Sequence, residues 1–286
     1  MNSFEHKKSS GYDLISNRIL KLTNSTIAPY LETLFNCCIY HGIFPDVFKI
    51  AQVIPLYKGG GKDDCNNYRP ISLLPAIGKL LEKLLAVRLS SHLHNHNILS
   101  KHQFGFRENF STELAVTDIY EKLLHNLDTG LHSCTIFLDL AKAFDSVNHS
   151  ILLKKLEKYG IRGLALKLFE SYLTNRSQFV KLNGVASSLM QILYGVPQGS
   201  ILDPLLFLIF INDLPEATSL YVKLFADDTF LCAQSKDFSS LETEVNKELD
   251  KVADWLLSNK LTLNIKKSKH MLIINLLKTP YSHCFF

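Results

Sequence analysis

Residues 220–232 read LYVKLFADDTFLC, an apolar stretch that an acidic pair interrupts. Two short runs rich in apolar and aromatic residues flank Phe225-Ala226-Asp227-Asp228, a pattern typical of two strands joined by a tight turn. An ionised carboxylate between apolar strands needs a partner, a cation or a raised pKa. Because Asp is common in ordinary turns, the pair by itself leaves a purely structural role open.

A further acidic residue, Asp139, lies in the apolar run CTIFLDL at residues 134–140, which predicts a buried strand. A hairpin carrying Asp-Asp beside this strand would form an oxygen-rich site that is open to a phosphate-bearing ligand. Hard oxygen ligands suit Mg²⁺, which keeps water molecules and substrate phosphates among its ligands. Two such ions about 3.5–4 Å apart can activate an attacking hydroxyl and stabilise the leaving oxygen of a phosphoryl transfer.

The other predicted elements mix strands and helices without βαβ alternation, which favours an α+β fold. Helical spacing of apolar residues predicts helices over residues 76–93, 152–159, 205–211 and 241–257. Strands are predicted over residues 179–182, 190–193, 220–224, 229–232, 261–265 and 271–276. The stretch 55–75 is rich in Gly, Asp, Asn and Pro, and is predicted to be a loop.

The composition of the chain is that of a folded protein. Its 286 residues are 47% hydrophobic and 20% charged, which excludes a disordered or fibrous chain. One large domain, two ordinary domains or two interleaved subdomains fit this length. The formal charge of +4 gives little evidence for a polyanionic partner. The six cysteines lack zinc or disulfide spacing, and the most apolar run is too short to span a bilayer, so we expect an intracellular protein without membrane segments.

Several motifs, taken together and in order, resemble the reverse transcriptase of non-LTR retrotransposons of the jockey-like and LINE type. The palm-like motifs are FLDLAKAFDSVNH (residues 137–149), GVPQGSILDPLLFLIFINDLP (195–215), FADD (225–228) and NKLTLNIKKSKHM (259–271). The finger-like motifs are GYDLISNRILK (11–21), the stretch 54–85 and QFGFRENFST (103–112). An ordered set of motifs is far more specific than FADD alone.

The resemblance implies the fingers and palm of a right-hand polymerase, with an antiparallel palm sheet packed on helices and a thumb that is absent or truncated. Residues 1–53 would lead into the fingers, 54–133 form the fingers, 134–275 form the palm with finger-palm elements at 160–195, and 276–286 are a truncated tail. The implied activity is addition of deoxynucleotides to a primer 3′-hydroxyl with two Mg²⁺ ions, or Mn²⁺ as a substitute. The implied partners are an RNA template, a DNA primer and deoxynucleoside triphosphates in the nucleus, and the oligomeric state stays open.

The family motifs assign metal and catalytic roles by position. Asp139 and Asp227 would be the metal-bridging carboxylates, Asp228 a supporting acid, and the carbonyl of Leu140 a further ligand. Lys267 would be the palm lysine that gives a proton to departing pyrophosphate. Together with the neighbouring lysines it could instead contact a nucleic-acid backbone or block pairing at a sheet edge.

The motifs also assign nucleotide contacts. Phe144 stands where the family places the aromatic residue that selects deoxynucleotides, and a core aromatic is the alternative. Gln198 and Gly199 match residues that lie against nucleotide and template. Lys58 and Arg69 would bind phosphate oxygens, and solvated loop cations are the alternative.

One residue departs from the family pattern. Asp203 stands where the family has glycine, and it would either repel phosphate or N-cap a helix that begins at Pro204. Two other functions stay open at this point. The chain could be a truncated, non-catalytic element remnant that at most binds nucleic acid, or a palm-type nucleotidyl cyclase, against which Gln198-Gly199 argues.

Overall fold

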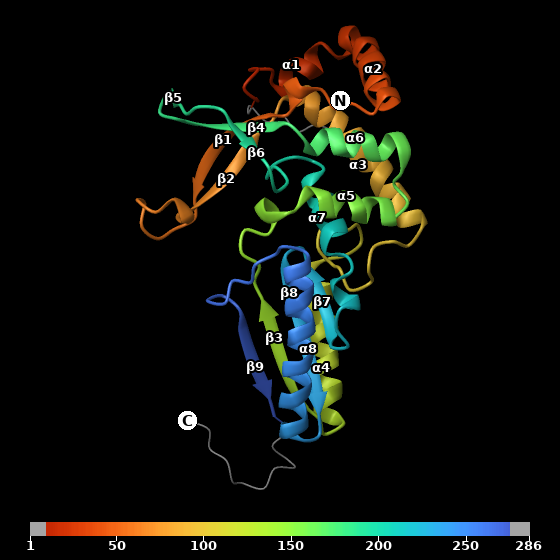
Figure 1. Cartoon of the computed structure of the whole chain (residues 1–286), viewed down its shortest axis with the longest axis vertical. Helices are drawn as coiled ribbons and strands as arrows, with labels where there is room; N and C mark the ends of the chain where they lie inside the picture. Colours follow the sequence, from red (N-terminus) through yellow and green to blue (C-terminus); the bar gives the residue numbers. More distant parts are fainter. Residues whose placement is uncertain (1–9, 275–286) are drawn as a thin grey trace. The chain divides into compact units, whose positions relative to one another are not determined.

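The computed structural model describes residues 10–274 of the chain (Figure 1). These residues form two compact units that are interleaved along the sequence. Unit 1 contains residues 10–98 and 144–210, and unit 2 contains residues 99–143 and 211–274. Interleaving is one of the arrangements that the length allowed, whereas the boundaries predicted for fingers and palm stay predictions.

The sheet of unit 1 has the strand order β2-β1-β4-β5, with β6 also paired to β4. Its strands are β1 (Ile50–Tyr57), β2 (Tyr68–Leu73), β4 (Arg176–Leu182), β5 (Val185–Ala186) and β6 (Met190–Ile192). β1 is antiparallel to β2 and parallel to β4. The loop predicted over residues 55–75 is therefore wrong at residues 55–57 and 68–73, which are strands. Pro70 misled the prediction, since proline is tolerated in an edge strand such as β2.

Unit 1 also contains helices. They are α1 (Asn17–Leu22), α2 (Asn24–His41), α3 (Ala76–Asn95), α5 (His149–Lys158), α6 (Gly163–Leu173) and α7 (Asp203–Ile211), with 3₁₀ turns at Asp46–Phe48, Cys65–Asn67 and Phe144–Ser146. The predicted helices at 76–93, 152–159 and 205–211 are confirmed. Phe207 and Phe210 of α7 are fully buried, as an all-apolar helix requires.

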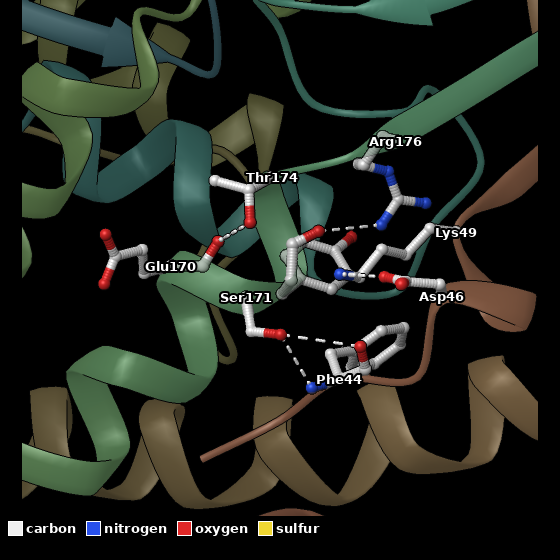
Figure 2. Close-up of polar contacts among 8 residues, drawn as sticks. Phe44, Asp46, Lys49, Glu170, Ser171, Thr174 and Arg176 are labelled. Atoms are coloured by element: carbon white, nitrogen blue, oxygen red, sulfur yellow. Dashed lines mark hydrogen bonds and ion pairs between the residues drawn. The ribbon is translucent and has the colours of Figure 1, made fainter.

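Polar contacts fasten the start of β4 to its surroundings (Figure 2). Ser171 Oγ accepts a hydrogen bond from the Phe44 amide at 3.0 Å. Arg176 is fully buried, donates from Nη1 to the Tyr172 carbonyl at 3.0 Å, and lies over the Tyr172 ring at 4.8 Å. These contacts fix the end of α6 and the strand that follows it.

The sheet of unit 2 is fully antiparallel, with the strand order β7-β8-β3-β9. Its strands are β3 (His132–Leu138), β7 (Tyr221–Phe225), β8 (Asp228–Ser235) and β9 (Lys269–Ile273). The strand predicted over residues 261–265 is wrong, because only Leu263 forms an isolated bridge, to Leu140. The amides of Lys267 and Ser268 bond back to the Asn264 carbonyl and close a turn there. Part of the predicted strand 271–276 lies outside the described residues.

Two helices cover opposite faces of this sheet, α4 (Thr112–Asp128) and α8 (Phe238–Ser258). His132 stacks on Phe238 of α8 at 4.2 Å. On the other face, Lys223 forms an ion pair with Asp118 of α4. By strand register Phe137 shares this second face, and 44% of it stays exposed. A 3₁₀ turn at Leu214–Glu216 precedes β7.

The observed mixture of antiparallel sheet and packed helices confirms the predicted α+β class. Within residues 10–274, no helix combines the length and the apolar character that a membrane crossing requires.

Candidate active site

The predicted site residues are divided between the two units. Unit 2 holds the predicted metal and catalytic residues, which are Asp139, Leu140, Asp227, Asp228 and Lys267. Unit 1 holds the predicted nucleotide-binding residues, which are Lys58, Arg69, Phe144, Gln198 and Gly199. Each group is therefore described within its own unit, and the roles of these residues stay predictions.

The β7–β8 hairpin presents two of the acids. Phe225 pairs with Asp228, so Ala226 and Asp227 form a two-residue turn. Ala226 has φ +56°, and a positive φ at the first turn residue alone is the pattern of a type II′ turn. Asp227 is half-buried and Asp228 is exposed. The tight turn thus places both acids at the ends of the strands.

Asp139 directly follows β3 and is fixed by the segment before β9. Its Oδ2 accepts a hydrogen bond from Asn264 Nδ2 at 2.8 Å, and Lys267 Nζ lies 4.0 Å from the same oxygen. Its carbonyl accepts from the Asn264 amide at 2.8 Å, and its amide donates to Ser268 Oγ at 3.2 Å. Both the main chain and the carboxylate of Asp139 are therefore held in place.

Asp139 and Asp228 line one cavity of about 700 Å³, together with Phe137, Phe225 and Phe230 among its apolar lining. Asp227 is not among the residues that line it. Partial desolvation raises the pKa of Asp228, and repulsion from Asp139 raises this pKa further, while Lys267 opposes the rise. Two carboxylates that repel each other in one cavity form a place where a cation is stabilised.

The donor set fits a hard divalent cation. Among residues 10–274, no three His, Cys, Asp or Glu side chains gather into a group that could hold a metal by themselves. Mg²⁺, however, is usually bound through one or two carboxylates plus substrate phosphates, so Asp139 and Asp228 suffice on the protein side. The bridge between Leu140 and Leu263 uses the Asp139 carbonyl and the Ala141 amide, and so does not consume the Leu140 carbonyl.

In unit 1, Gln198 and Gly199 are tied to β2. The Gln198 carbonyl accepts from the Ser72 amide at 2.8 Å, and Gln198 Nε2 donates to Asp145 Oδ1 at 2.9 Å. Gly199 has φ +112°, and a Cβ there would lie 2.8 Å from the Ser72 carbonyl oxygen. Glycine is needed at this position for both reasons.

The remaining predicted nucleotide contacts lie on two elements of unit 1. The half-buried Phe144 ring packs on Phe207 with centroids 4.3 Å apart, so it makes the core contact that the alternative interpretation expected. Lys58 and Arg69 are exposed near the tip of the β1–β2 hairpin, where Arg69 pairs with Leu56. Both cations are placed where they can meet a ligand or solvent.

Asp203 is buried and is the first helical residue of α7, so the prediction that it caps this helix is wrong. Its amide instead donates to Ser200 Oγ at 2.9 Å, and the first bond of the helix runs from the Leu206 amide to the Leu202 carbonyl. Burial raises the pKa of Asp203 to about 8, and the nearby Asp145 and Glu82 add to the rise. At neutral pH the carboxyl is therefore mostly uncharged, which removes most of the expected repulsion of phosphate.

Glu82 on α3 is a further buried acid, only 1% exposed. Its Oε2 accepts from the Ile201 amide at 2.7 Å, next to the start of α7. Burial raises the pKa of Glu82, while the positive charge of Arg176 opposes this rise. Glu82 thus holds the backbone at Ile201, three residues after Gln198.

Sequence reasoning missed four supporting residues. Asn264, Ser268 and Asp145 lie inside motifs that were singled out, and their polar side chains beside predicted ligands were a usable signal. Glu82 interrupts the apolar stripe of the predicted helix 76–93, which was a second signal.

Comparison with known proteins agrees with this geometry. The family model described as "Reverse transcriptase (RNA-dependent DNA polymerase)" matches residues 58–283. The chain is 31% identical over 278 residues to the RNA-directed DNA polymerase from mobile element jockey of Drosophila melanogaster, covering 94% of this chain and 30% of that protein. It is 30% identical over 253 residues to the putative 115 kDa protein in the type-1 retrotransposable element R1DM of the same fly, covering 87% and 24%.

Solved structures show the same fold. Apo telomerase from Candida tropicalis superposes with a TM-score of 0.59 at 13% identity, covering 95% of this chain and 52% of that chain. The chain spans about a third or less of the curated relatives described above. The family model matches most of the length of this chain. The chain belongs to the reverse transcriptase family.

Proposed function

We propose that this chain is the fingers and palm part of the RNA-directed DNA polymerase of a non-LTR retrotransposon. The observation that carries the proposal is the pair of carboxylates, Asp139 and Asp228, that line one cavity and repel each other there. Membership of the reverse transcriptase family supports it, as do relatives named RNA-directed DNA polymerase. Unit 2 carries the acids of the palm motifs, and unit 1 carries Lys58 and Arg69 of the fingers together with the palm motif around Gln198.

The palm residues hold the metal and the reacting groups. Asp139 and Asp228 are the carboxylate ligands, with Asp227 and the Leu140 carbonyl as the further ligands that the family motif implies. Bound Mg²⁺ would activate the primer 3′-hydroxyl and neutralise charge on the transferred phosphate. Asn264 keeps the Asp139 carboxylate in one orientation, because its amide donates to Oδ2 at 2.8 Å.

Lys267 serves the leaving group. The primer hydroxyl attacks the α-phosphorus, the bond from that phosphorus to pyrophosphate breaks, and Lys267 Nζ donates a proton to the departing oxygen. The side chain is 72% exposed and lies 4.0 Å from Asp139 Oδ2, so it can leave the carboxylate for a phosphate. Its positive charge also attracts the phosphates before the reaction.

Residues of unit 1 bind the nucleotide. Gln198 is held by Asp145, and Gly199 allows the backbone to approach a base or sugar closely. Phe144 lies against the sugar and excludes a 2′-hydroxyl, supported from behind by Phe207. Lys58 and Arg69 take phosphate oxygens.

Primer extension tests this proposal. Purified chain should extend a DNA primer annealed to RNA in the presence of Mg²⁺, and Asp139→Asn should abolish extension. Extension that survives this substitution would sink the metal assignment. A folded chain that binds primer and template without extending would instead identify a non-catalytic remnant, and cyclisation of a nucleotide without primer would identify a cyclase.

A further inference from the structure

The turn between β7 and β8 has a conformation that its sequence does not favour. Ala226 has φ +56°, in the left-handed region that glycine occupies most easily. Two-residue hairpin turns with this pattern usually carry glycine at that position. Ala226 immediately precedes the acidic pair, so any relaxation of its backbone would re-aim both acids.

One buried side chain contacts both polar groups of the Ala226 backbone. Gln103 is 1% exposed, and its Oε1 accepts hydrogen bonds from the Ala226 amide at 3.1 Å and the Gly105 amide at 2.7 Å. Its Nε2 lies 3.5 Å from the Ala226 carbonyl oxygen. A carboxamide is suited to this place, since it offers an acceptor with two lone pairs and a donor in one plane.

The segment that carries Gln103 is itself fastened to the hairpin. The Phe104 amide donates to the Leu224 carbonyl, and the Leu224 amide donates to the His102 carbonyl, both at 2.8 Å. Gln103 and Leu224 therefore form a parallel bridge along the edge of β7. The segment that carries Gln103 is therefore bonded to the strand that leads into the turn.

Gly105 and Arg107 complete this support. A Cβ at Gly105 would lie 2.3 Å from the Ala226 amide nitrogen, so the two backbones are in direct contact. Arg107 Nη1 donates to the carbonyls of Ser100 and Gln103, at 2.8 and 3.0 Å. Arg107 thus fixes the backbone of the segment that carries Gln103.

We propose that Gln103 is a positioning residue for the metal site, whose carboxamide holds the Ala226 backbone in the left-handed conformation that aims Asp227 and Asp228. This inference rests on the proposed function, because it assigns Gln103 to the same carboxylates. A merely structural amide would lower stability when removed and would leave metal affinity unchanged in the folded protein. Removal of a positioning amide lowers metal affinity. A glycine at position 226 adopts positive φ without help, so it should compensate for that removal.

The test compares three variants of the full chain. Gln103→Leu removes both hydrogen-bonding functions at similar volume. Gln103→Leu with Ala226→Gly removes the clamp and also the penalty for positive φ. Gln234→Leu, at an exposed glutamine of β8 in the same hairpin, is the matched control.

The probe is Mn²⁺, with binding followed by electron paramagnetic resonance and the Ala226 amide followed by hydrogen exchange in NMR. In Gln103→Leu, Mn²⁺ affinity should fall by about 10–100-fold, as for other groups that orient metal ligands, and exchange at Ala226 should accelerate. The double variant should recover most of the lost affinity. Gln234→Leu should bind Mn²⁺ as the wild type does.

Unchanged Mn²⁺ affinity in folded Gln103→Leu would overturn the inference, and so would a loss that Ala226→Gly leaves uncorrected or a wild-type chain that binds no Mn²⁺. If Gln103→Leu does not fold, Gln103→Asn replaces it, since the shorter amide cannot reach Ala226, and the same rescue is required. A wild-type chain that binds Mn²⁺ yet does not extend a primer would sink the proposed function alone, because neither readout here depends on polymerisation.

Discussion

Two acids of unit 2, Asp139 and Asp228, and two acids of unit 1, Glu82 and Asp203, lie in opposite kinds of surroundings. In unit 2, Asp139 and Asp228 line one cavity, and partial burial followed by repulsion from Asp139 raises the pKa of Asp228. In unit 1, Glu82 and Asp203 are 1% and 6% exposed. Glu82 accepts a backbone amide, and Asp203 is mostly uncharged at neutral pH.

A shifted carboxyl pKa therefore does not by itself mark a reactive group. What decides its role is what its oxygens face. The two unit 2 carboxylates line a cavity, Asp139 is oriented by the neutral donor Asn264, and the nearby cation Lys267 is 72% exposed and can leave the carboxylate when a ligand binds. The unit 1 carboxyls face helix ends and buried side chains, so they stabilise the backbone beside Gln198.

The largest expected effect is on activity in unit 2. Asp139→Asn should reduce nucleotide incorporation to background, because an amide cannot replace an anionic metal ligand. The free energy of unfolding should change little, since repulsion from Asp228 disappears along with the charge. Single-turnover incorporation and urea denaturation measure the two quantities, and a strongly destabilised variant would contradict the contrast with unit 1.

Orientation of the same carboxylate should matter next. Asn264→Ala should lower the incorporation rate by about 10–100-fold through weaker metal binding, as expected for a group that orients a ligand. Higher Mg²⁺ should restore part of the loss. Asn246→Ala, at an exposed position of α8, is the control and should be neutral. A loss insensitive to Mg²⁺ would show that Asn264 acts elsewhere.

In unit 1 the expected effect is on stability. Glu82→Ala should lower the free energy of unfolding by about 2–3 kcal/mol, because it leaves the Ile201 amide without its acceptor and removes the negative charge that interacts with the buried Arg176. Urea denaturation measures this loss, with Glu32→Ala at an exposed site of α2 as the control. If Glu82→Ala is as stable as the control, the supporting role of Glu82 is wrong.

The smallest expected effect is the change in stability over a single pH unit. The pKa of Asp203 is about 8 in the folded protein and near its ordinary value of 3.8 when unfolded. Its contribution to stability is therefore fully present below about pH 4 and is lost as pH rises towards 8, by about 1.4 kcal/mol per pH unit at most. Asp203→Asn should remove this dependence on pH. The free energy of unfolding of the variant should therefore rise relative to that of the wild type between pH 5 and 8. Parallel stability curves for the two proteins would refute the buried, protonated state.

Sequence patterns predicted the palm-like elements well for a physical reason. Short buried strands such as β3 and β8, and helices such as α3 and α7, carry local apolar patterns that few other structures satisfy. The stretch around Leu263 has a similar apolar pattern, yet hydrogen bonds of Asn264 and Ser268 to Asp139 turn the chain instead.

The candidate site was predictable in the same uneven way. The acids stood out because of their apolar flanks. Asn264 did not, because its role depends on a contact with a residue 125 positions away. Gln103 was quoted within a motif, but its contact with Ala226 spans 123 positions and could be seen only in three dimensions.

The most direct test of the contrast is single-turnover incorporation of one deoxynucleotide into a DNA primer on an RNA template, comparing Asp139→Asn with Asp203→Asn at pH 7. We predict that the wild-type chain and Asp203→Asn incorporate at rates within about threefold of each other, a difference of less than 1 kcal/mol in activation free energy. Asp139→Asn should show no incorporation above background. Incorporation by Asp139→Asn at the wild-type rate, or loss in Asp203→Asn alone, would contradict the account.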